Sequence, residues 1–175
     1  MRPRTRFIRQ AARQLLKDCR ISDPPVDLRV VAAKLGLGYE EVDYFPDDVE
    51  ALIVPMEDRT VAVVNKNFPK NHRRFSLAHE LCHHYLHQDR SVLEDPNTID
   101  ASDLDSSDLL GTEAATKDPL EAEADIFAGE LLVPLFMLKK HYKPGFTAGD
   151  IARIFEVSEA AASVALLNHF SALFK

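Results

Sequence analysis

The chain has 175 residues, of which 46% are hydrophobic and 28% are charged, a composition typical of an ordinary globular protein with one main core. Its formal net charge of −7 argues against general binding to nucleic acids or to anionic membrane surfaces. Two cysteines, Cys19 and Cys82, are too few for a disulfide framework of the secreted kind. No apolar run reaches a transmembrane length, and the arginine-rich start has no apolar segment after it, so we expect a cytoplasmic protein.

The first part of the chain predicts two helices separated by a break. Residues 4–18 have the spacing of an amphipathic helix, with arginines on a face that we expect to be solvated. Residues 22–25 contain two prolines and end this helix. Asp27 is placed to cap a short second helix that runs to Leu35 and stops at Gly36. The apolar residues on one side of the first helix are Phe7, Ile8, Ala11, Ala12, Leu15 and Leu16.

Three short runs with β-strand character follow the second helix. They comprise residues 37–42, 51–54 and 60–64, and residues 55–59 form a hairpin connection between the last two. We expect a small antiparallel sheet that supports the next helix. An edge strand of this sheet is suited to pair with the backbone of an extended peptide substrate.

Residues 75–87 are predicted to form a helix that carries a His-Glu-x-x-His motif. Apolar side chains recur on one face at spacings of three and four, and no Gly or Pro interrupts the segment. Because residues four apart lie one above the other, His79 and His83 project from one side. Two such imidazoles can bind Zn²⁺, and Glu80 between them can act as general base on a water molecule. Cys82 lies on the apolar face and is expected to be a buried hydrophobic residue.

Residues 88–117 differ in character from the segments on either side. Ser, Asp, Thr and Asn dominate there, with only scattered leucines. A loop of this length in a compact domain is usually functional or disordered. Two interpretations stay open: a solvated acidic tract, and a lid or substrate-guiding segment over the site.

A helix that begins after Asp118, with Pro119 at its first position, carries the second group of candidate site residues. Glu121 and Asp125 are four apart and share a face. A site with two histidines needs a third protein ligand, for which Glu121 is the candidate, and Asp125 is placed to hydrogen-bond a ligating histidine. Glu121 equally fits a capping box with Asp118. Glu123 is the rival ligand, but it points away from the face of Asp125.

The C-terminal part predicts three more helices. The first follows Pro134 and ends near Tyr142, and Thr147 and Ser158 are suited to cap the other two. The last two resemble a helix-turn-helix. No Lys or Arg occurs in residues 154–174, whereas duplex binding requires the neutralisation of phosphates, so we expect no direct binding of duplex DNA. The small apolar residues favour a structural or repressor-docking role.

Two motifs of this chain resemble the ImmA/IrrE family of metallopeptidases. Residues 74–83 read Arg-Phe-Ser-Leu-Ala-His-Glu-Leu-Cys-His, and residues 121–134 read Glu-x-x-Ala-Asp-x-Phe-Ala-x-x-Leu-Leu-x-Pro. Cys82 stands where the family often has glycine, and Asp125 where it often has asparagine, but neither difference removes a ligand. The similarity extends to shorter stretches, namely residues 24–27, 35–37 and 151–158.

The resemblance implies that zinc is bound by His79, His83 and Glu121 and that Glu80 is the catalytic glutamate. It thereby favours the ligand role of Glu121 over its role in a capping box. Members of the family are cytoplasmic regulatory proteases of bacteria and their mobile elements. They cleave, or otherwise inactivate, a helix-turn-helix transcriptional repressor, often in response to stress. The resemblance therefore implies such a repressor as the protein substrate.

Together these observations predict an α+β fold. We expect a mainly helical, zincin-like metallopeptidase domain at residues 1–143, and a helical, helix-turn-helix-like subdomain at residues 144–175 packed on it. The expected function is that of a zinc endopeptidase. The alternative is a non-enzymatic module that binds a repressor or an antitoxin-like partner and holds zinc for structure only. The complete motif with Glu80 favours the enzyme, because a structural site needs no base.

Overall fold

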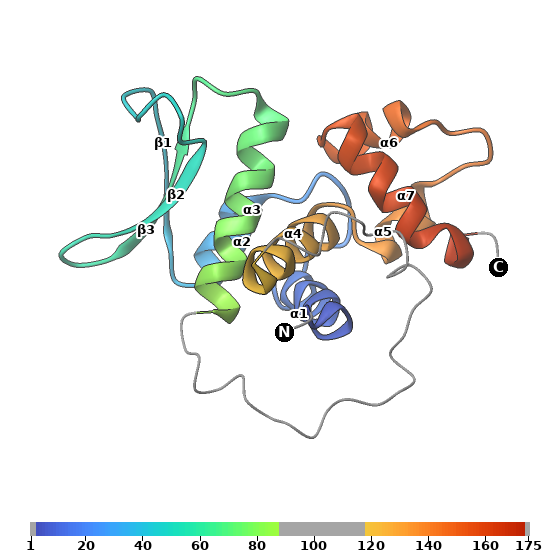
Figure 1. Cartoon of the computed structure of the whole chain (residues 1–175), viewed down its shortest axis with the longest axis horizontal. Coiled ribbons are helices and arrows are strands. Elements are labelled where there is room, and N and C mark those ends of the chain that lie inside the picture. Colours follow the sequence, from blue (N-terminus) through green and yellow to red (C-terminus); the bar gives the residue numbers. More distant parts are fainter. Residues whose placement is uncertain (1–2, 88–117, 174–175) are drawn as a thin grey trace.

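The computed structural model describes residues 3–87 and 118–173, so the predicted acidic loop or lid at residues 88–117 lies outside the described part. Helix α3 lies between the sheet on one side and helices α4 and α1 on the other (Figure 1). The predicted α+β class is confirmed. Among the described helices, none combines the length and the hydropathy that a membrane span requires. The elements in chain order are α1 (Thr5–Asp18), α2 (Leu28–Lys34), β1 (Gly38–Val42), β2 (Ala51–Pro55), β3 (Thr60–Asn65), α3 (Lys70–Leu86), α4 (Pro119–Leu132), α5 (Leu135–His141), α6 (Ala148–Phe155) and α7 (Glu159–Leu173).

The sheet is mixed, so the prediction of an antiparallel sheet is wrong. Its strand order is β1-β3-β2. Strand β2 runs antiparallel to β3, with Ala51 opposite Val64, whereas β1 runs parallel to β3, with Gly38 opposite Val61. Strands β1 and β2 are consecutive in sequence and run in opposite directions, but they are not neighbours in the sheet. Strand β3 lies between them and pairs with both. Strand β2 is the edge of the sheet that contacts α3.

Both faces of β3 are buried, which explains its central position. Ala62 and Val64 belong to the main core, whereas Val61 and Val63 form a second cluster with Val42 of β1. A strand with a continuous apolar run is favoured where neighbours cover both of its faces and both of its edges. The central position therefore follows from its sequence, while the direction of β1 does not.

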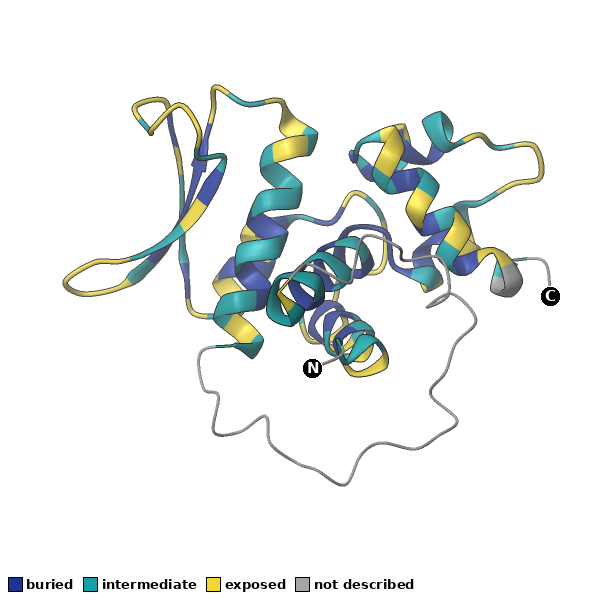
Figure 2. Cartoon of the chain, viewed as in Figure 1, coloured by how far each residue is buried: buried dark blue, intermediate teal, exposed yellow. Residues whose placement is uncertain are grey.

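The main core lies where α1, α3 and α4 meet, and Figure 2 shows the buried residues of these helices in dark blue. The predicted apolar side of α1 is largely confirmed, but Phe7 is 46% exposed and stacks on Arg4 instead. The expectation that the arginines of this helix are all solvated is wrong. Arg4 and Arg13 pair with Glu123 and Glu130 of α4, because carboxylates can be buried there only when they are paired.

Four predicted helix ends are confirmed by their backbone geometry. The carboxylates of Asp27 and Asp118 accept hydrogen bonds from backbone N–H groups in the first turns of α2 and α4. Thr147 forms a capping box with Asp150 at the start of α6. Gly36 ends α2 with a φ of +76°, a conformation that suits glycine because it lacks a Cβ atom.

The buried carboxylate of Glu130 makes the stability of this helix pair depend on pH. Burial alone raises the pKa of Glu130, but the hydrogen bonds from His169 and Arg13 outweigh it and leave this pKa below its ordinary value. A carboxyl with a lowered pKa stabilises the fold above its ordinary pKa of about 4.3, and this contribution is lost as the pH falls.

We expect Glu130→Gln to lower the free energy of unfolding by about 1–3 kcal/mol at pH 7. The difference between variant and wild type should shrink as the pH falls below about 4, since wild-type Glu130 then gains a proton. Urea unfolding at pH 7 and at pH 3.5 measures both quantities. A difference that stays the same at the two pH values would contradict this assignment.

Candidate metal centre

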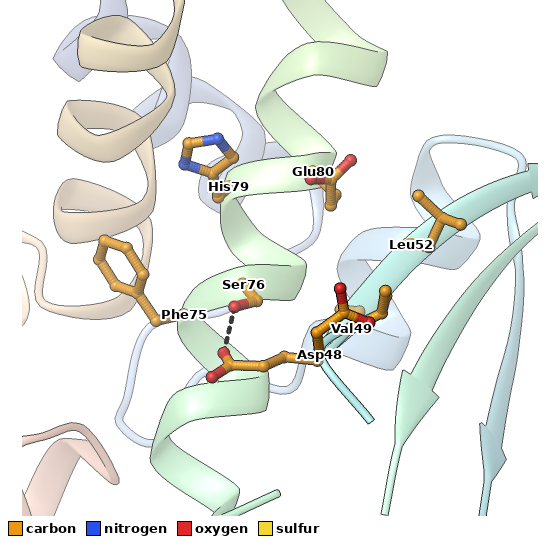
Figure 3. Close-up of a pocket in the computed structure, with 9 residues that line it drawn as sticks. Asp48, Val49, Leu52, Phe75, Ser76, His79 and Glu80 are labelled. Atoms are coloured by element: carbon orange, nitrogen blue, oxygen red, sulfur yellow. Dashed lines mark hydrogen bonds between the residues drawn. The ribbon is translucent and has the colours of Figure 1, made fainter. Parts of the chain in front are cut away.

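Helix α3 places the two histidines of the motif toward α4. Leu81 and Cys82 are fully buried, as predicted for Cys82, and they fix the rotation of the helix against the core. His79 and His83 then lie on the side that faces α4, with half-buried rings. Glu80, the next residue along, points in a different direction, toward the sheet (Figure 3).

The nitrogen atoms of these histidines converge with a carboxylate from the first turn of α4. His79 Nε2 lies 3.1 Å from His83 Nε2 and 3.1 Å from Glu121 Oε2. His83 Nε2 lies 3.2 Å from Glu121 Oε1. The cap of α4 is made by Asp118, which accepts a hydrogen bond from the backbone of Leu120. The Glu121 carboxylate is thus directed at the two imidazoles.

The geometry of these three groups fits a tetrahedral zinc ion. Ligand atoms about 2.0–2.1 Å from a tetrahedral zinc lie about 3.3 Å apart, which is close to the separations between the three side chains. Two neutral imidazoles and one carboxylate also form the ligand set of hydrolytic zinc sites that keep a position open for water. Among the described residues, His79, His83 and Glu121 form the group with the spacing of a metal site.

Asp125 lies one helical turn beyond Glu121 and contacts the other side of the His79 ring. Its Oδ1 is 3.0 Å from His79 Nδ1. This hydrogen bond is the main reason that the pKa of His79 is raised above its ordinary value. A proton on Nδ1 that is donated to Asp125 leaves the lone pair of Nε2 directed at Glu121 and His83. This is the orienting position that the spacing of four between Glu121 and Asp125 predicts.

The corresponding partner of His83 is a residue to which the sequence analysis gave no role. His87 Nδ1 lies 3.0 Å from His83 Nδ1, and His87 Nε2 lies 3.2 Å from Glu123 Oε2. Glu123, the rival ligand, is buried and pairs with Arg4, away from the three converging groups. The spacing of four between His83 and His87 was a signal for the first contact. No local signal connects Arg4 with Glu123.

Glu80 lines a pocket of about 460 Å³ between α3 and the sheet. Figure 3 shows Glu80 and Leu52 on opposite sides of this pocket, and His79, which also lines it, on the side of α3 toward α4. The Ser76 hydroxyl of α3 donates a hydrogen bond to Glu50, which precedes β2 and ties the strand to the helix. The motif therefore presents both Glu80 and His79 to this pocket, while His79 and His83 also face α4.

Comparisons with known proteins identify a family and relatives for this chain. Residues 25–167 match the IrrE N-terminal-like domain of the peptidase M78 family. The chain is 30% identical over 102 residues to Metallopeptidase ImmA of Bacillus subtilis (strain 168), which covers 57% of this chain and 51% of that protein. It also has the fold of a Mycobacterium tuberculosis transcriptional regulator, with a TM-score of 0.61, 22% identity, and coverage of 92% of this chain and 46% of that one.

At 22% identity the second likeness concerns the fold alone. The chain spans about half the length of each of these two relatives. The family match, in contrast, covers most of the chain and includes both helices that carry the converging side chains. The protein therefore belongs to the family of IrrE N-terminal-like domains, as its two motifs predicted.

Proposed function

We propose that the protein is a cytoplasmic zinc-dependent endopeptidase that cleaves, and so inactivates, a helix-turn-helix transcriptional repressor. The observation that carries the proposal is the convergence of three side chains: His79 Nε2 lies 3.1 Å from His83 Nε2 and 3.1 Å from Glu121 Oε2, and His83 Nε2 lies 3.2 Å from Glu121 Oε1. A carboxylate that can act as a base, Glu80, follows directly on the same helix and lines a pocket. Membership of a peptidase family supports the same reaction class.

The residues of this chain have separate tasks in the proposed reaction. His79, His83 and Glu121 would hold the zinc ion, which, when bound, lowers the pKa of water and polarises the scissile carbonyl. Glu80 accepts the proton of the attacking water and delivers it to the leaving amine nitrogen. Asp125 keeps His79 in the tautomer whose Nε2 is free to bind metal.

Strand β2 is the candidate site for the substrate backbone. It pairs with β3 along one edge, and its other edge pairs with no strand of the described residues. Leu52 of β2 is 41% exposed and lines the same pocket as Glu80. An extended peptide added to this edge would make main-chain hydrogen bonds and pass in front of the proposed base.

The C-terminal helices are the candidate surface for the repressor. Helices α6 and α7 are joined by residues 156–158, and we propose that residues 144–175 form a helix-turn-helix-like subdomain docked on a zincin-like domain of residues 1–143. His169 of α7, which lies 3.4 Å from the Glu130 carboxylate of α4, supports the docking. Val164 and Leu167 are exposed on α7 without a cationic neighbour on that helix, which favours a protein over DNA. One relative in fold is itself named a transcriptional regulator.

The alternative function is that of a non-enzymatic partner-binding module with a structural zinc ion. The exposed apolar residues of α7 favour it, since single-chain surfaces rarely present several large apolar side chains on one helix. Mass spectrometry of a candidate repressor incubated with the zinc-loaded protein tests the two functions. The endopeptidase should yield two fragments whose masses add up to that of the repressor plus one water, and the binding module should leave the repressor intact.

Removal of the proposed third ligand should weaken metal binding strongly. We expect Glu121→Gln to lower zinc affinity by more than about 100-fold, because removal of an outer partner of a ligand alone costs 10–100-fold. Competition with a chromophoric chelator measures this affinity. Glu40→Gln is the matched control, since it removes the same charge from an exposed position on β1 and should leave the affinity unchanged. Equal affinities in the two variants would exclude Glu121 as a ligand.

A further inference from the structure

A continuous chain of side chains leads from the proposed metal ligand His83 to the start of α1. His83 Nδ1 lies 3.0 Å from His87 Nδ1, and His87 Nε2 lies 3.2 Å from a Glu123 oxygen. Arg4 contacts the same carboxylate three times: its backbone N and its Nε lie 2.9 Å from Oε1, and its Nη2 lies 2.7 Å from Oε2. We call these four residues the His83–Arg4 chain.

We infer that His87 and Glu123 are positioning residues that set the tautomer and the ring orientation of His83, and that Arg4 anchors them. This inference rests on the proposed function, because it takes His83 as a metal ligand. It adds one residue that directly follows α3, one on α4 and one before α1 to the machinery of the site.

The geometry determines which nitrogen atom carries the proton at each step of the His83–Arg4 chain. Two ring nitrogens 3.0 Å apart share one proton, so one donates and the other accepts. A histidine that binds metal through Nε2 carries its proton on Nδ1, so His83 donates and His87 Nδ1 accepts. His87 then carries its own proton on Nε2 and donates it to Glu123. Glu123 is an acceptor only, and the N–H groups of Arg4 occupy its remaining lone pairs.

Burial favours this arrangement of protons over arrangements that leave a donor or an acceptor without a partner. The side chains of His87 and Glu123 are 4% and 2% exposed, so water cannot replace a missing partner without a rearrangement. A carboxylate on the outer nitrogen of a ligating histidine raises the basicity of that ligand. His79 receives this effect directly from Asp125, whereas His83 receives it from Glu123 through one intervening imidazole.

Arg4 lies outside residues 25–167, the part that matches the family. Arg4, which anchors the His83–Arg4 chain, therefore belongs to the segment before the family domain. Its backbone N–H, as well as its side chain, donates to Glu123, so the position of the start of α1 is fixed against the carboxylate. The hydrogen bonds that orient His83 therefore depend on the position of α1 against α4.

A closely similar group elsewhere on the same helices provides the control. Glu130 of α4 is 3% exposed, pairs with Arg13 of α1 at 2.7 Å, and lies 3.4 Å from a buried histidine, His169. This group also joins α1 to α4 but touches none of the proposed ligands. Glu130→Gln therefore reproduces the loss of a buried carboxylate between these helices without a change at the metal centre.

The experiment compares zinc affinity in wild type, Glu123→Gln and Glu130→Gln by chelator competition at one pH. We expect Glu123→Gln to lower the affinity by about 10–100-fold and Glu130→Gln to change it by less than about two-fold. Arg4→Lys keeps the charge but loses the paired hydrogen bonds of the guanidinium, so a smaller loss than in Glu123→Gln is expected. It also serves as the test variant should Glu123→Gln fail to fold.

A second readout follows the tautomer itself. In ¹⁵N NMR spectra of the zinc-loaded wild type, His83 should be protonated on Nδ1 and His87 on Nε2, and the His87 signals should change in Glu123→Gln but not in Glu130→Gln. Unchanged zinc affinity in Glu123→Gln, or equal losses in both variants, would overturn the positioning role. Failure of the proposed function is distinct, because the zinc-loaded wild type would then leave the candidate repressor intact, whatever the zinc affinities of these variants.

Discussion

Replacement of Glu80 with Gln should abolish peptide hydrolysis while zinc stays bound. The amide cannot accept the proton of the attacking water, and loss of a positioned general base costs about 10²–10⁴-fold in rate. Glu80 and His79 both line the pocket beside β2, but Glu80 is not one of the three converging groups, so the substitution leaves the ligand geometry intact. The rate of repressor cleavage and the zinc content of the purified variant are the two measurements.

The outcome for Glu80→Gln separates the two candidate functions. Glu40→Gln is the control, because it removes an exposed carboxylate from β1, the other edge strand. This variant should cleave the repressor at the wild-type rate. A Glu80→Gln protein that binds zinc and still inactivates its repressor fully would favour the non-enzymatic binding module. Loss of zinc together with activity would instead mean that Glu80 supports the metal centre.

Truncation of Phe127 should have the largest effect on folding. This side chain of α4 is fully buried, and its ring centroid lies 6.3 Å from that of Tyr85 on α3. We expect Phe127→Ala to lower the free energy of unfolding by about 3–5 kcal/mol, since it leaves a cavity between the two helices that carry the proposed ligands. Zinc affinity should fall as well, because Glu121 is held by the same helix.

Denaturant unfolding with and without zinc measures both effects. Phe136→Ala is the matched control, because Phe136 is 38% exposed and its truncation should cost at most about 1 kcal/mol. If Phe127→Ala destabilised the protein no more than Phe136→Ala does, the packing of α4 on α3 would not be the main support of the site.

Local signals in the sequence were sufficient for several helix starts, but not for that of α3, which begins at Lys70 without a side-chain cap and before the predicted segment of residues 75–87. Side chains that cap a helix act within three residues, so Asp27, Asp118 and Thr147 could mark helix starts without knowledge of the fold. The paired histidines were equally local, since helical geometry alone puts residues four apart on one side. Glu121 was different, because its own segment allowed both capping and metal binding, and only the resemblance to a family favoured the second.

Contacts between distant segments could not be predicted in this way. The direction of β1 depends on where β3 inserts, which no pattern within β1 specifies. Arg4 and Arg13 looked like members of a solvated face because an isolated helix shows no partner for them. The role of His87 likewise depends on Glu123, which is supplied by another helix and is buried only in the folded protein.

The proposed ligands are divided between α3 and α4, and residues 88–117 separate these helices in sequence. A bound ion would thus act as a cross-link that exists in the native state and not in the unfolded chain. At a free zinc concentration a thousand times the dissociation constant, such binding raises the free energy of unfolding by about 4 kcal/mol. Cellular metal supply would then govern how long the protein resists degradation, as well as whether it is catalytically competent.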